Sequence, residues 1–360
     1  MKQIVQYQKT GAMMVADLSE PVLREGGVLV ANHFSLISAG TERTSVQTAK
    51  ASMIAKARMR PDLVKQVLEN VRREGLFPTV KKVRTRLDNY KELGYSSAGV
   101  VIATSVDAFR PGDPVACAGA GFASHAEIVF IPRNLAVRVP EAVPLSDAAY
   151  TTVGAIALQG VRQADVRIGE HVAVIGLGLI GLITVQLLKS AGCRVVGLDV
   201  ASVNFPLAKE LGCDVCFVSN RGAVKNVLAW SRAYGTDAVI ITAGTDSNEP
   251  LELSMEIARK RSHVVVVGAV RMDVPRSPFY EKELDLRISC AYGPGRYDPS
   301  YELRGCDYPV GYVRWTENRN MEGFLDLLAA GRINVRRLTT HTIPIDDGLR
   351  AYDIITGKRR

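Results

Sequence analysis

The sequence predicts an α/β protein that contains a doubly wound parallel sheet and a second, β-rich domain. Between residues 149 and 290, apolar runs alternate with helical stretches, which is typical of a parallel sheet covered by helices on both faces. A glycine loop joins the first of these runs to a helix. On either side of this region, short strand signals are bounded by glycine and proline, as in a compact β-rich domain. The 360 residues are enough for two such domains.

The apolar runs of the predicted sheet are short and regularly spaced. We expect strands at 171–175, 194–199, 215–218, 238–242, 263–268 and 286–291, with helices such as 180–190, 203–211 and 249–260 between them. The stretch Val172–Leu188 approaches the length of a membrane span. Glycines near its start and polar residues near its end fit a buried strand, a tight turn and a buried helix better, so we expect no membrane span.

Residues 1–148 and 291–360 make up the second predicted domain. Its strand signals lie at 28–32, 36–37, 99–102 and 126–130, and an apolar helix at 321–330 ends at a glycine.

The segment 46–90 interrupts the β-rich domain and carries most of the net charge. It holds eleven Lys and Arg against four Asp and Glu, a surplus of seven in a chain of net charge +8. Apolar residues from Leu63 to Val71 recur at helical spacing, with a proline in the first turn. We therefore expect a basic helical insertion that attracts anionic substrates or is covered by partner helices. Only Phe77 and Tyr90 offer stacking platforms, so we expect no nucleic-acid binding.

The six cysteines are scattered through apolar or strand-like stretches, a pattern that suits reduced thiols in a cytoplasmic protein. Cys213 and Cys216 form the one CxxC pair. Neither a second such pair nor a nearby pair of histidines completes a zinc site. We interpret both thiols as core residues beside a predicted buried strand.

The glycine loop is the strongest functional signal in the sequence. Gly176, Gly178 and Gly181 follow an apolar strand and open a helix, as in the dinucleotide-binding loop of a Rossmann domain. Asp199 ends the next strand, where a carboxylate binds the adenosine ribose and repels the extra phosphate of NADP. We therefore predict NAD(H) as the cofactor; a purely structural Rossmann domain is the alternative. Further predicted contacts are Leu179, Ile180, Ala243, Gly244, Gly268 and Ala269.

Several motifs in order resemble the medium-chain dehydrogenases/reductases, the alcohol dehydrogenase superfamily. They are Ser38–Glu42 (SAGTE), Gly94–Val101 (GYSSAGVV), Pro111–Val115 (PGDPV), the strand from Gly121 to Pro132, the glycine loop and Asp199. The resemblance spans essentially the whole chain. It implies a GroES-like catalytic domain at 1–148 and 291–360, a Rossmann domain at 149–290, and a homo-oligomer.

The sequence departs from that superfamily at the positions of the zinc ligands. The first ligand of the family falls at Ala39, its histidine at Tyr95, the neighbouring glutamate at Ser96 and the last ligand near Thr151 and Thr152. The structural-zinc region keeps only Cys117. Because catalytic zinc needs three protein ligands and structural zinc needs four, we predict no metal of either kind.

A narrower resemblance points to zinc-less "bi-domain oxidoreductases" of bacterial polysaccharide loci. It rests on the SAGTER and GYSSAGVV segments, Thr151–Ala164, Cys290–Pro299 and Asp307–Glu317. In those proteins a second oxidoreductase domain follows, so this chain is expected to be either a truncated form or a stand-alone relative. The SAGTER segment also resembles bacteriochlorophyllide dehydrogenase, another zinc-less member.

Without zinc, hydrogen-bond donors must polarise the substrate oxygen. Thr41 matches the proton-relay hydroxyl of the family, Tyr95 stands in place of a zinc ligand, and His125 is of the residue type that commonly serves as a general acid or base. Glu42 could orient or deprotonate any of them. The structural alternatives are a turn cap for Thr41, packing for Tyr95 and a satisfied strand histidine for His125.

The C-terminal part of the chain supplies the remaining candidates. Tyr292 follows the sixth Rossmann strand, where family members contact the nicotinamide, and Thr152 is also expected beside the cofactor. Arg296, Arg314 and Trp315 suit a carboxylated or phosphorylated sugar, with plain surface charge as the alternative.

These observations predict a zinc-independent, NAD-dependent oxidoreductase that interconverts a secondary alcohol and a ketone. The resemblance, and not the residues, suggests a carbohydrate derivative as substrate. Two alternatives remain: an NADH-dependent reductase of double bonds or quinones, and a dinucleotide-binding module without turnover that supports a partner oxidoreductase domain.

Overall fold

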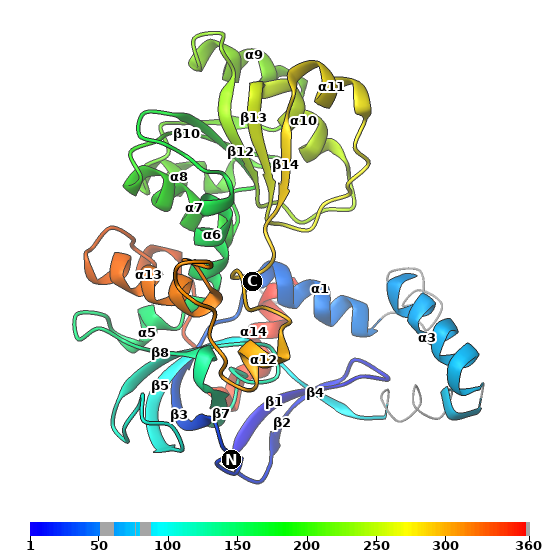
Figure 1. Cartoon of the computed structure of the whole chain (residues 1–360), viewed down its shortest axis with the longest axis vertical. Helices are drawn as coiled ribbons and strands as arrows, with labels where there is room; N and C mark the ends of the chain where they lie inside the picture. The colour runs from blue at the N-terminus through cyan, green and yellow to red at the C-terminus, as the bar shows by residue number, and fades with distance from the viewer. Residues whose placement is uncertain (51–60, 76, 80–87, 358–360) are drawn as a thin grey trace.

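The computed structural model describes residues 1–50, 61–75, 77–79 and 88–357. Two bodies are visible in Figure 1: a parallel sheet with its helices, and a β-rich part that contains the N-terminus. The basic residues Lys56, Arg58, Arg60, Lys81, Lys82, Arg84 and Arg86 of the predicted insertion lie outside the described residues.

The first body is built on a six-stranded parallel sheet with the order β11-β10-β9-β12-β13-β14. Its strands are β9 (His171–Ile175), β10 (Arg194–Asp199), β11 (Val215–Val218), β12 (Thr236–Ile241), β13 (Ala258–Val266) and β14 (Asp285–Ile288). The strand order reverses between β9 and β12, which creates a crevice at the carboxyl ends of these strands. Ligands of doubly wound folds bind at this point.

Helices cover both faces of the parallel sheet. One face packs against α6 (Thr151–Gln163), α7 (Leu179–Ser190) and α8 (Phe205–Glu210), and the other against α9 (Arg221–Trp230), α10 (Glu249–Ile257) and α11 (Arg276–Lys282). Because both faces are covered, the central strands are continuous apolar runs and not alternating ones. The predicted α/β class with a doubly wound sheet and a β-rich domain is confirmed.

The β-rich body contains two antiparallel sheets. A five-stranded sheet has the order β7-β3-β5-β6-β8 and a three-stranded sheet the order β2-β1-β4. The strands are β1 (Lys2–Tyr7), β2 (Met13–Asp17), β3 (Gly27–Ser35), β4 (Tyr90–Glu92), β5 (Ser96–Thr104), β6 (Pro114–Ala118), β7 (Ile128–Pro132) and β8 (Ala136–Arg138).

Helices from distant parts of the chain complete this body. They are α1 (Ala39–Lys50), α3 (Pro61–Glu74), α5 (Leu145–Ala148), α12 (Pro299–Glu302), α13 (Glu317–Ala329) and α14 (Gly348–Ile355), with short 3-10 turns at Arg133–Leu135, Arg336–Leu338 and Ile345–Asp347. A further 3-10 turn, Ser202–Asn204, lies in the first body between β10 and α8. Figure 1 shows α14 beside α1, and α13 lies against α6. No helix in the described part of the chain is long and apolar enough to cross a membrane.

The structure corrects the predicted bounds at the end of β3. Leu36 and Ile37 follow the strand instead of continuing it, and α1 begins at Ala39, ahead of the predicted insertion. The reason is local: the Glu42 backbone N–H donates to the Ser38 carbonyl at 3.0 Å, while the Ser38 N–H donates to the Glu42 carboxylate at 3.4 Å. This pairing closes the first helical turn.

Two bounds in the parallel sheet also differ from the prediction. The helix expected at 249–260 ends at Ile257, because Ala258 already pairs with Thr236 in the sheet. The strand expected at 286–291 ends at Ile288, and Ala291 adopts a left-handed φ of 46°. The chain therefore turns into the β-rich body earlier than the apolar run suggests.

Candidate functional site

The glycine loop has the geometry that the sequence motif implies. Gly176 has φ +101°, in the left-handed region that glycine favours. A Cβ on Gly181 would overlap the carbonyl oxygen of Gly176, so only glycine lets α7 pack this close to the loop. A Cβ on Gly178 would meet nothing within 4 Å. The loop thus leaves open space above Gly178, at the start of a twelve-residue helix whose first N–H groups can bind a phosphate.

Asp199 is held against this loop. Its carboxylate accepts hydrogen bonds from the backbone N–H groups of Leu177, at 2.7 Å, and Ala201, at 3.1 Å. Asn204 donates to the Leu177 carbonyl at 2.9 Å. The acidic residue, the glycine loop and the turn after β10 therefore form one unit.

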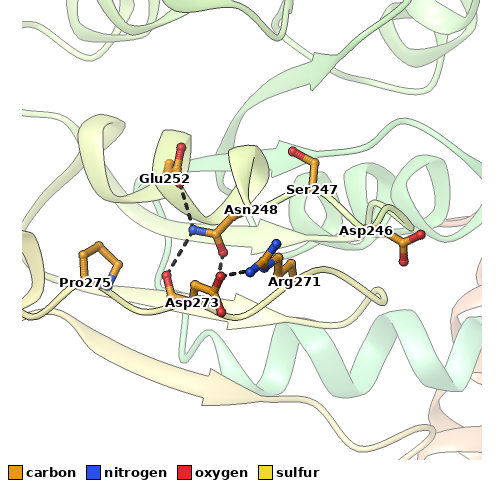
Figure 2. Close-up of a pocket in the computed structure, with 7 residues that line it drawn as sticks. All are labelled: Asp246, Ser247, Asn248, Glu252, Arg271, Asp273 and Pro275. Atoms are coloured by element: carbon orange, nitrogen blue, oxygen red, sulfur yellow. Dashed lines mark hydrogen bonds and ion pairs between the residues drawn. The ribbon is translucent and has the colours of Figure 1, made fainter. Parts of the chain in front are cut away.

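The loops after β12 and β13 meet at the same edge of the sheet. A Cβ on Gly268 would overlap the carbonyl of Ala243, which explains why that position has no side chain. Farther out, these loops enclose the hollow of about 460 Å³ shown in Figure 2. There Asn248 joins the loops: it donates to Glu252 at 2.9 Å and to the Asp273 carbonyl at 3.0 Å. The hollow is open and acidic, and none of the predicted site residues lines it.

The positions that correspond to zinc ligands are occupied by residues that do not fit zinc. The Ser96 hydroxyl donates to the Ala149 carbonyl at 2.6 Å, and the Thr152 hydroxyl lies 3.3 Å from the carbonyls of Tyr95 and Cys117. Both hydroxyls are thus engaged by the backbone. Within the described ranges, no group of three His, Cys, Asp or Glu is placed to hold a metal ion.

The phenol oxygen of Tyr95, beside Ser96, is an unusual polar group. This oxygen is buried and makes no hydrogen bond of good geometry, although the hydroxyls of Ser38 and Thr41 face it. Burial raises the pKa of Tyr95, and the hydroxyls of Ser38 and Thr41 partly oppose that rise. Tyr95 is therefore a neutral hydrogen-bond donor at neutral pH. The structure brings Thr41 and Tyr95 together, as expected for a shared role.

A buried network adjoins this pair. The Glu42 carboxylate lies 3.2 Å from His125 Nε2 and accepts a hydrogen bond of 2.5 Å from the Tyr352 hydroxyl. The other ring nitrogen, Nδ1, lies 2.8 Å from the Ser35 hydroxyl. Gly94 packs directly on the imidazole, because a Cβ there would lie 2.9 Å from Nδ1. His125 is thus held on both nitrogens and on one face.

His125 and Ser35 border a groove of about 670 Å³. Its wall also includes Ala39 at the start of α1 and Leu179 at the start of α7, together with the segment 338–345. The groove therefore connects the position of the first zinc ligand of the resembling family with the beginning of the glycine-loop helix.

Comparisons with known proteins agree with this architecture. Residues 180–303 match the family model described as zinc-binding dehydrogenase. The alcohol dehydrogenase from Thermus sp. ATN1 superposes with a TM-score of 0.75 at 19% identity, covering 99% of this chain and 97% of that protein. Galactitol-1-phosphate dehydrogenase from Escherichia coli superposes with a TM-score of 0.71 at 19% identity, covering 98% and 97%. The chain has the fold of a medium-chain dehydrogenase/reductase.

The chain is also similar in sequence to reductases and dehydrogenases of sugars. A probable D-xylulose reductase A from Emericella nidulans is 24% identical over 304 residues, which are 74% of this chain and 77% of that protein. D-guloside 3-dehydrogenase from Shigella flexneri is 28% identical over 268 residues, 72% of each chain. These sequence relatives and the structural matches agree on the fold, that of a medium-chain dehydrogenase/reductase.

Within this fold, the predicted substrate residues separate into two places. Arg296 forms an ion pair with Glu302 and lies 4.3 Å from the Tyr297 ring centroid. Beneath it are two buried groups without hydrogen-bond partners, the Tyr292 hydroxyl and both carboxylate oxygens of Glu317. Burial raises the pKa of Glu317 to about 9, with Glu302 adding to the rise and Arg296 opposing it.

Arg314 and Trp315 lie elsewhere, at the far end of α6. The guanidinium carbons of Arg162 and Arg314 lie 3.2 Å and 3.7 Å from the Trp315 ring centroid. Arg162 is ten residues along α6 from Thr152, roughly 15 Å at the helical rise. The structure thus does not bring Arg314 and Trp315 to the position of Tyr95 and Thr152.

Four residues of these networks were not predicted from the sequence: Ser35, Tyr352, Arg162 and Glu317. Tyr352 and Glu42 are 310 positions apart and meet only through folding. Glu317 was detectable as an acidic residue that follows Thr316 at a helix start, but that pattern usually indicates an exposed helix cap.

Proposed function

We propose that the chain is a zinc-independent, NAD(H)-dependent oxidoreductase that interconverts a secondary alcohol and a ketone. The observations that carry the proposal are a glycine loop that is open above Gly178 and hydrogen-bonded to Asp199, and a buried Tyr95 phenol. Tyr95 stands where the resembling family is expected to have a zinc ligand. The dehydrogenases and reductases among its relatives support this class of reaction.

The choice of NAD over NADP rests on Asp199 and its surroundings. A carboxylate at this position accepts hydrogen bonds from the ribose hydroxyls and repels a 2′-phosphate. The next five residues, Val200 to Asn204, include neither Lys nor Arg that would bind that phosphate. One solved structure of the same fold, a putative zinc-binding dehydrogenase from Sinorhizobium meliloti, is bound to NADP, so the fold alone does not determine the cofactor.

The Asp199→Asn variant should shift cofactor preference towards NADP by about tenfold or more, because it removes one charge near the phosphate position, an effect worth about 1.4 kcal/mol. Asparagine keeps an oxygen that can accept from the Leu177 N–H, so the loop should stay intact. The ratio of dissociation constants for NADH and NADPH, measured by fluorescence titration, tests this. An unchanged ratio would show that Asp199 does not select NAD.

The mechanism assigns the proton chemistry to residues of this chain. When bound, the nicotinamide supplies or accepts the hydride. Tyr95, neutral because burial raises its pKa, donates a hydrogen bond to the substrate oxygen, and the Thr41 hydroxyl is the second donor. Two such donors take over the polarising role that zinc has in other members of the superfamily. Burial of the Tyr95 hydroxyl strengthens its hydrogen bond.

The double variant Thr41→Val with Tyr95→Phe is expected to lower kcat by roughly 100-fold or more, the usual contribution of such donors. Dinucleotide affinity should be unchanged, because the glycine loop is untouched. Steady-state kinetics with secondary alcohols and ketones, together with NADH titration, provide the test. If the double variant keeps wild-type turnover, Tyr95 and Thr41 do not handle the proton.

The proposed zinc independence leads to a separate prediction. Purified protein should contain zinc only far below one ion per chain, and a strong chelator should leave turnover unchanged. Metal analysis with a chelator titration measures both, with a zinc-containing alcohol dehydrogenase as the positive control. Stoichiometric zinc together with chelator-sensitive activity would refute this part of the proposal.

The substrate class rests on the relatives alone. Three of those proteins are named for xylulose, a guloside and galactitol 1-phosphate, and we therefore infer a carbohydrate derivative. Labelled NADH distinguishes the alternatives by product: the label appears on a carbinol carbon for a ketone, and on a saturated carbon–carbon bond for a double-bond reductase.

A further inference from the structure

The CxxC pair of the sequence lies at the start of β11, outside the site described above. The Sγ atoms of Cys213 and Cys216 are 3.6 Å apart, and both residues are free thiols. Cys213 is 4% exposed and is the core residue that the sequence predicts, whereas Cys216 is partly exposed. The two sulfur atoms are thus in contact, and one of them belongs to a residue that solvent reaches.

The surroundings of the pair distinguish the two thiols. The Cys213 thiol, as a hydrogen-bond donor, lowers the pKa of Cys216; partial burial opposes this effect, and Lys209 from α8 adds to it. The contact with Cys216 and burial raise the pKa of Cys213. The carboxylate of Asp214, between the two cysteines in the sequence, is bound to Lys189 at 3.0 Å. Cys216 is therefore the thiol that ionises more readily, and the thiolate is the reactive form.

The other cysteines lack this combination of features. Burial raises the pKa of Cys117 to about 12 and that of Cys193 to about 11, so both of these thiols stay protonated at neutral pH. Cys290 and Cys306 are exposed, and in the described part of the chain neither contacts a second thiol. An accessible thiol of lowered pKa beside a second thiol, as at Cys216, is the arrangement found in redox-sensing cysteines.

Cys213 also packs beneath the proposed dinucleotide loop. A Cβ on Gly197 of β10 would lie 3.1 Å from Cys213 Sγ and 3.0 Å from the Leu177 side chain, so both side chains rest on this glycine. The Leu177 N–H donates to the Asp199 carboxylate at 2.7 Å. Because a disulfide holds its sulfur atoms about 2.05 Å apart, oxidation would draw Cys213 Sγ from its present position and change the close packing beneath Leu177.

We propose that Cys213 and Cys216 form a dithiol that hydrogen peroxide oxidises to a disulfide, and that this disulfide weakens dinucleotide binding at the glycine loop. The effect on the dinucleotide rests on the proposed function, whereas the chemistry of the pair does not. The Cys216 thiolate attacks one peroxide oxygen, the O–O bond breaks, and the hydroxide that leaves takes up the proton that the thiol released. Cys213 sulfur then displaces the hydroxyl of the resulting sulfenic acid as a second water. The two thiols lose two electrons, which the peroxide gains.

Mass spectrometry of the full chain after peroxide treatment tests the chemistry. Trypsin releases residues 210–221 as one peptide that holds both cysteines of the pair and no other. In the oxidised chain this peptide should lack two hydrogen atoms, resist alkylation and recover with dithiothreitol. In Cys213→Ser the reaction should stop at a sulfenic acid on Cys216, which dimedone traps. The matched control is Cys306→Ser, which should form the disulfide as the wild type does. Fully alkylated Cys213 and Cys216, at a peroxide concentration that oxidises Cys290, would overturn the proposal.

NADH titration by fluorescence tests the effect on the loop. The oxidised wild type should bind NADH about fivefold more weakly than the reduced wild type, the lower end of what a shape change in a close-packed core costs. Cys216→Ser, which leaves Cys213 Sγ in place, should bind NADH equally before and after peroxide. A disulfide in the wild type without loss of NADH affinity would overturn the proposed effect on the loop. If even the reduced chain binds no NADH, the proposed function is the part that fails, and the peptide measurement still decides whether the pair is redox-active.

Discussion

Gly178→Ala should weaken dinucleotide binding by at least 100-fold, about 2.7 kcal/mol, while leaving the fold intact. The added methyl group meets no atom of the protein within 4 Å, so it costs the free protein little. It occupies the space in which a pyrophosphate must approach the backbone. Isothermal titration with NADH and thermal denaturation of the free protein measure the two effects separately.

Two further glycines serve as controls for this experiment. Gly311→Ala, at another open position without a left-handed backbone, should change neither property. Gly181→Ala should lower both affinity and stability, because its Cβ would overlap the Gly176 carbonyl. Should Gly178→Ala bind NADH as tightly as the wild type does, the loop does not hold the pyrophosphate, and the proposed cofactor site is wrong.

Glu317→Gln should stabilise the protein, and the gain should grow with pH. Burial raises the pKa of Glu317 to about 9 in the folded chain, whereas in the unfolded chain it lies near its ordinary value of 4.5. At a pH between these two pKa values, the Glu317 carboxyl group is ionised in the unfolded chain but still protonated in the folded chain. The wild type therefore loses stability as pH rises through this window, by up to about 1.4 kcal/mol per unit, or roughly 3 kcal/mol at pH 7. Glutamine removes that dependence.

Urea unfolding of both proteins at several pH values between 5 and 9 measures how the free energy of unfolding changes with pH. The matched control is Glu249→Gln, because Glu249 opens α10 as Glu317 opens α13 but is exposed. That control should show the same pH dependence as the wild type. If the free energy of unfolding changes with pH in the same way for the wild type and Glu317→Gln, Glu317 is already ionised in the folded state.

The sequence by itself determined the parts of this protein that depend on local patterns. The signals are short apolar runs, the glycines at 176, 178 and 181, and the acid at 199. Each of them acts on the backbone over a short stretch of the chain. They were sufficient to predict the parallel sheet, the turn into α7 and the position of Asp199. The resemblance to a known superfamily then led to the prediction that the chain binds no zinc, which remains a prediction.

The tertiary structure alone decided which distant polar groups meet. The contact of Tyr352 with Glu42 joins residues 310 positions apart, and that of His125 with Glu42 joins residues 83 positions apart. No periodicity encodes such a pairing, because it depends on how α14 and the β-rich body pack around α1. The same holds for Glu317 and for Arg162, whose sequence context suggests ordinary helix residues. Glu317 is distinguished only by its burial near Arg296, and Arg162 only by its stacking on the Trp315 ring.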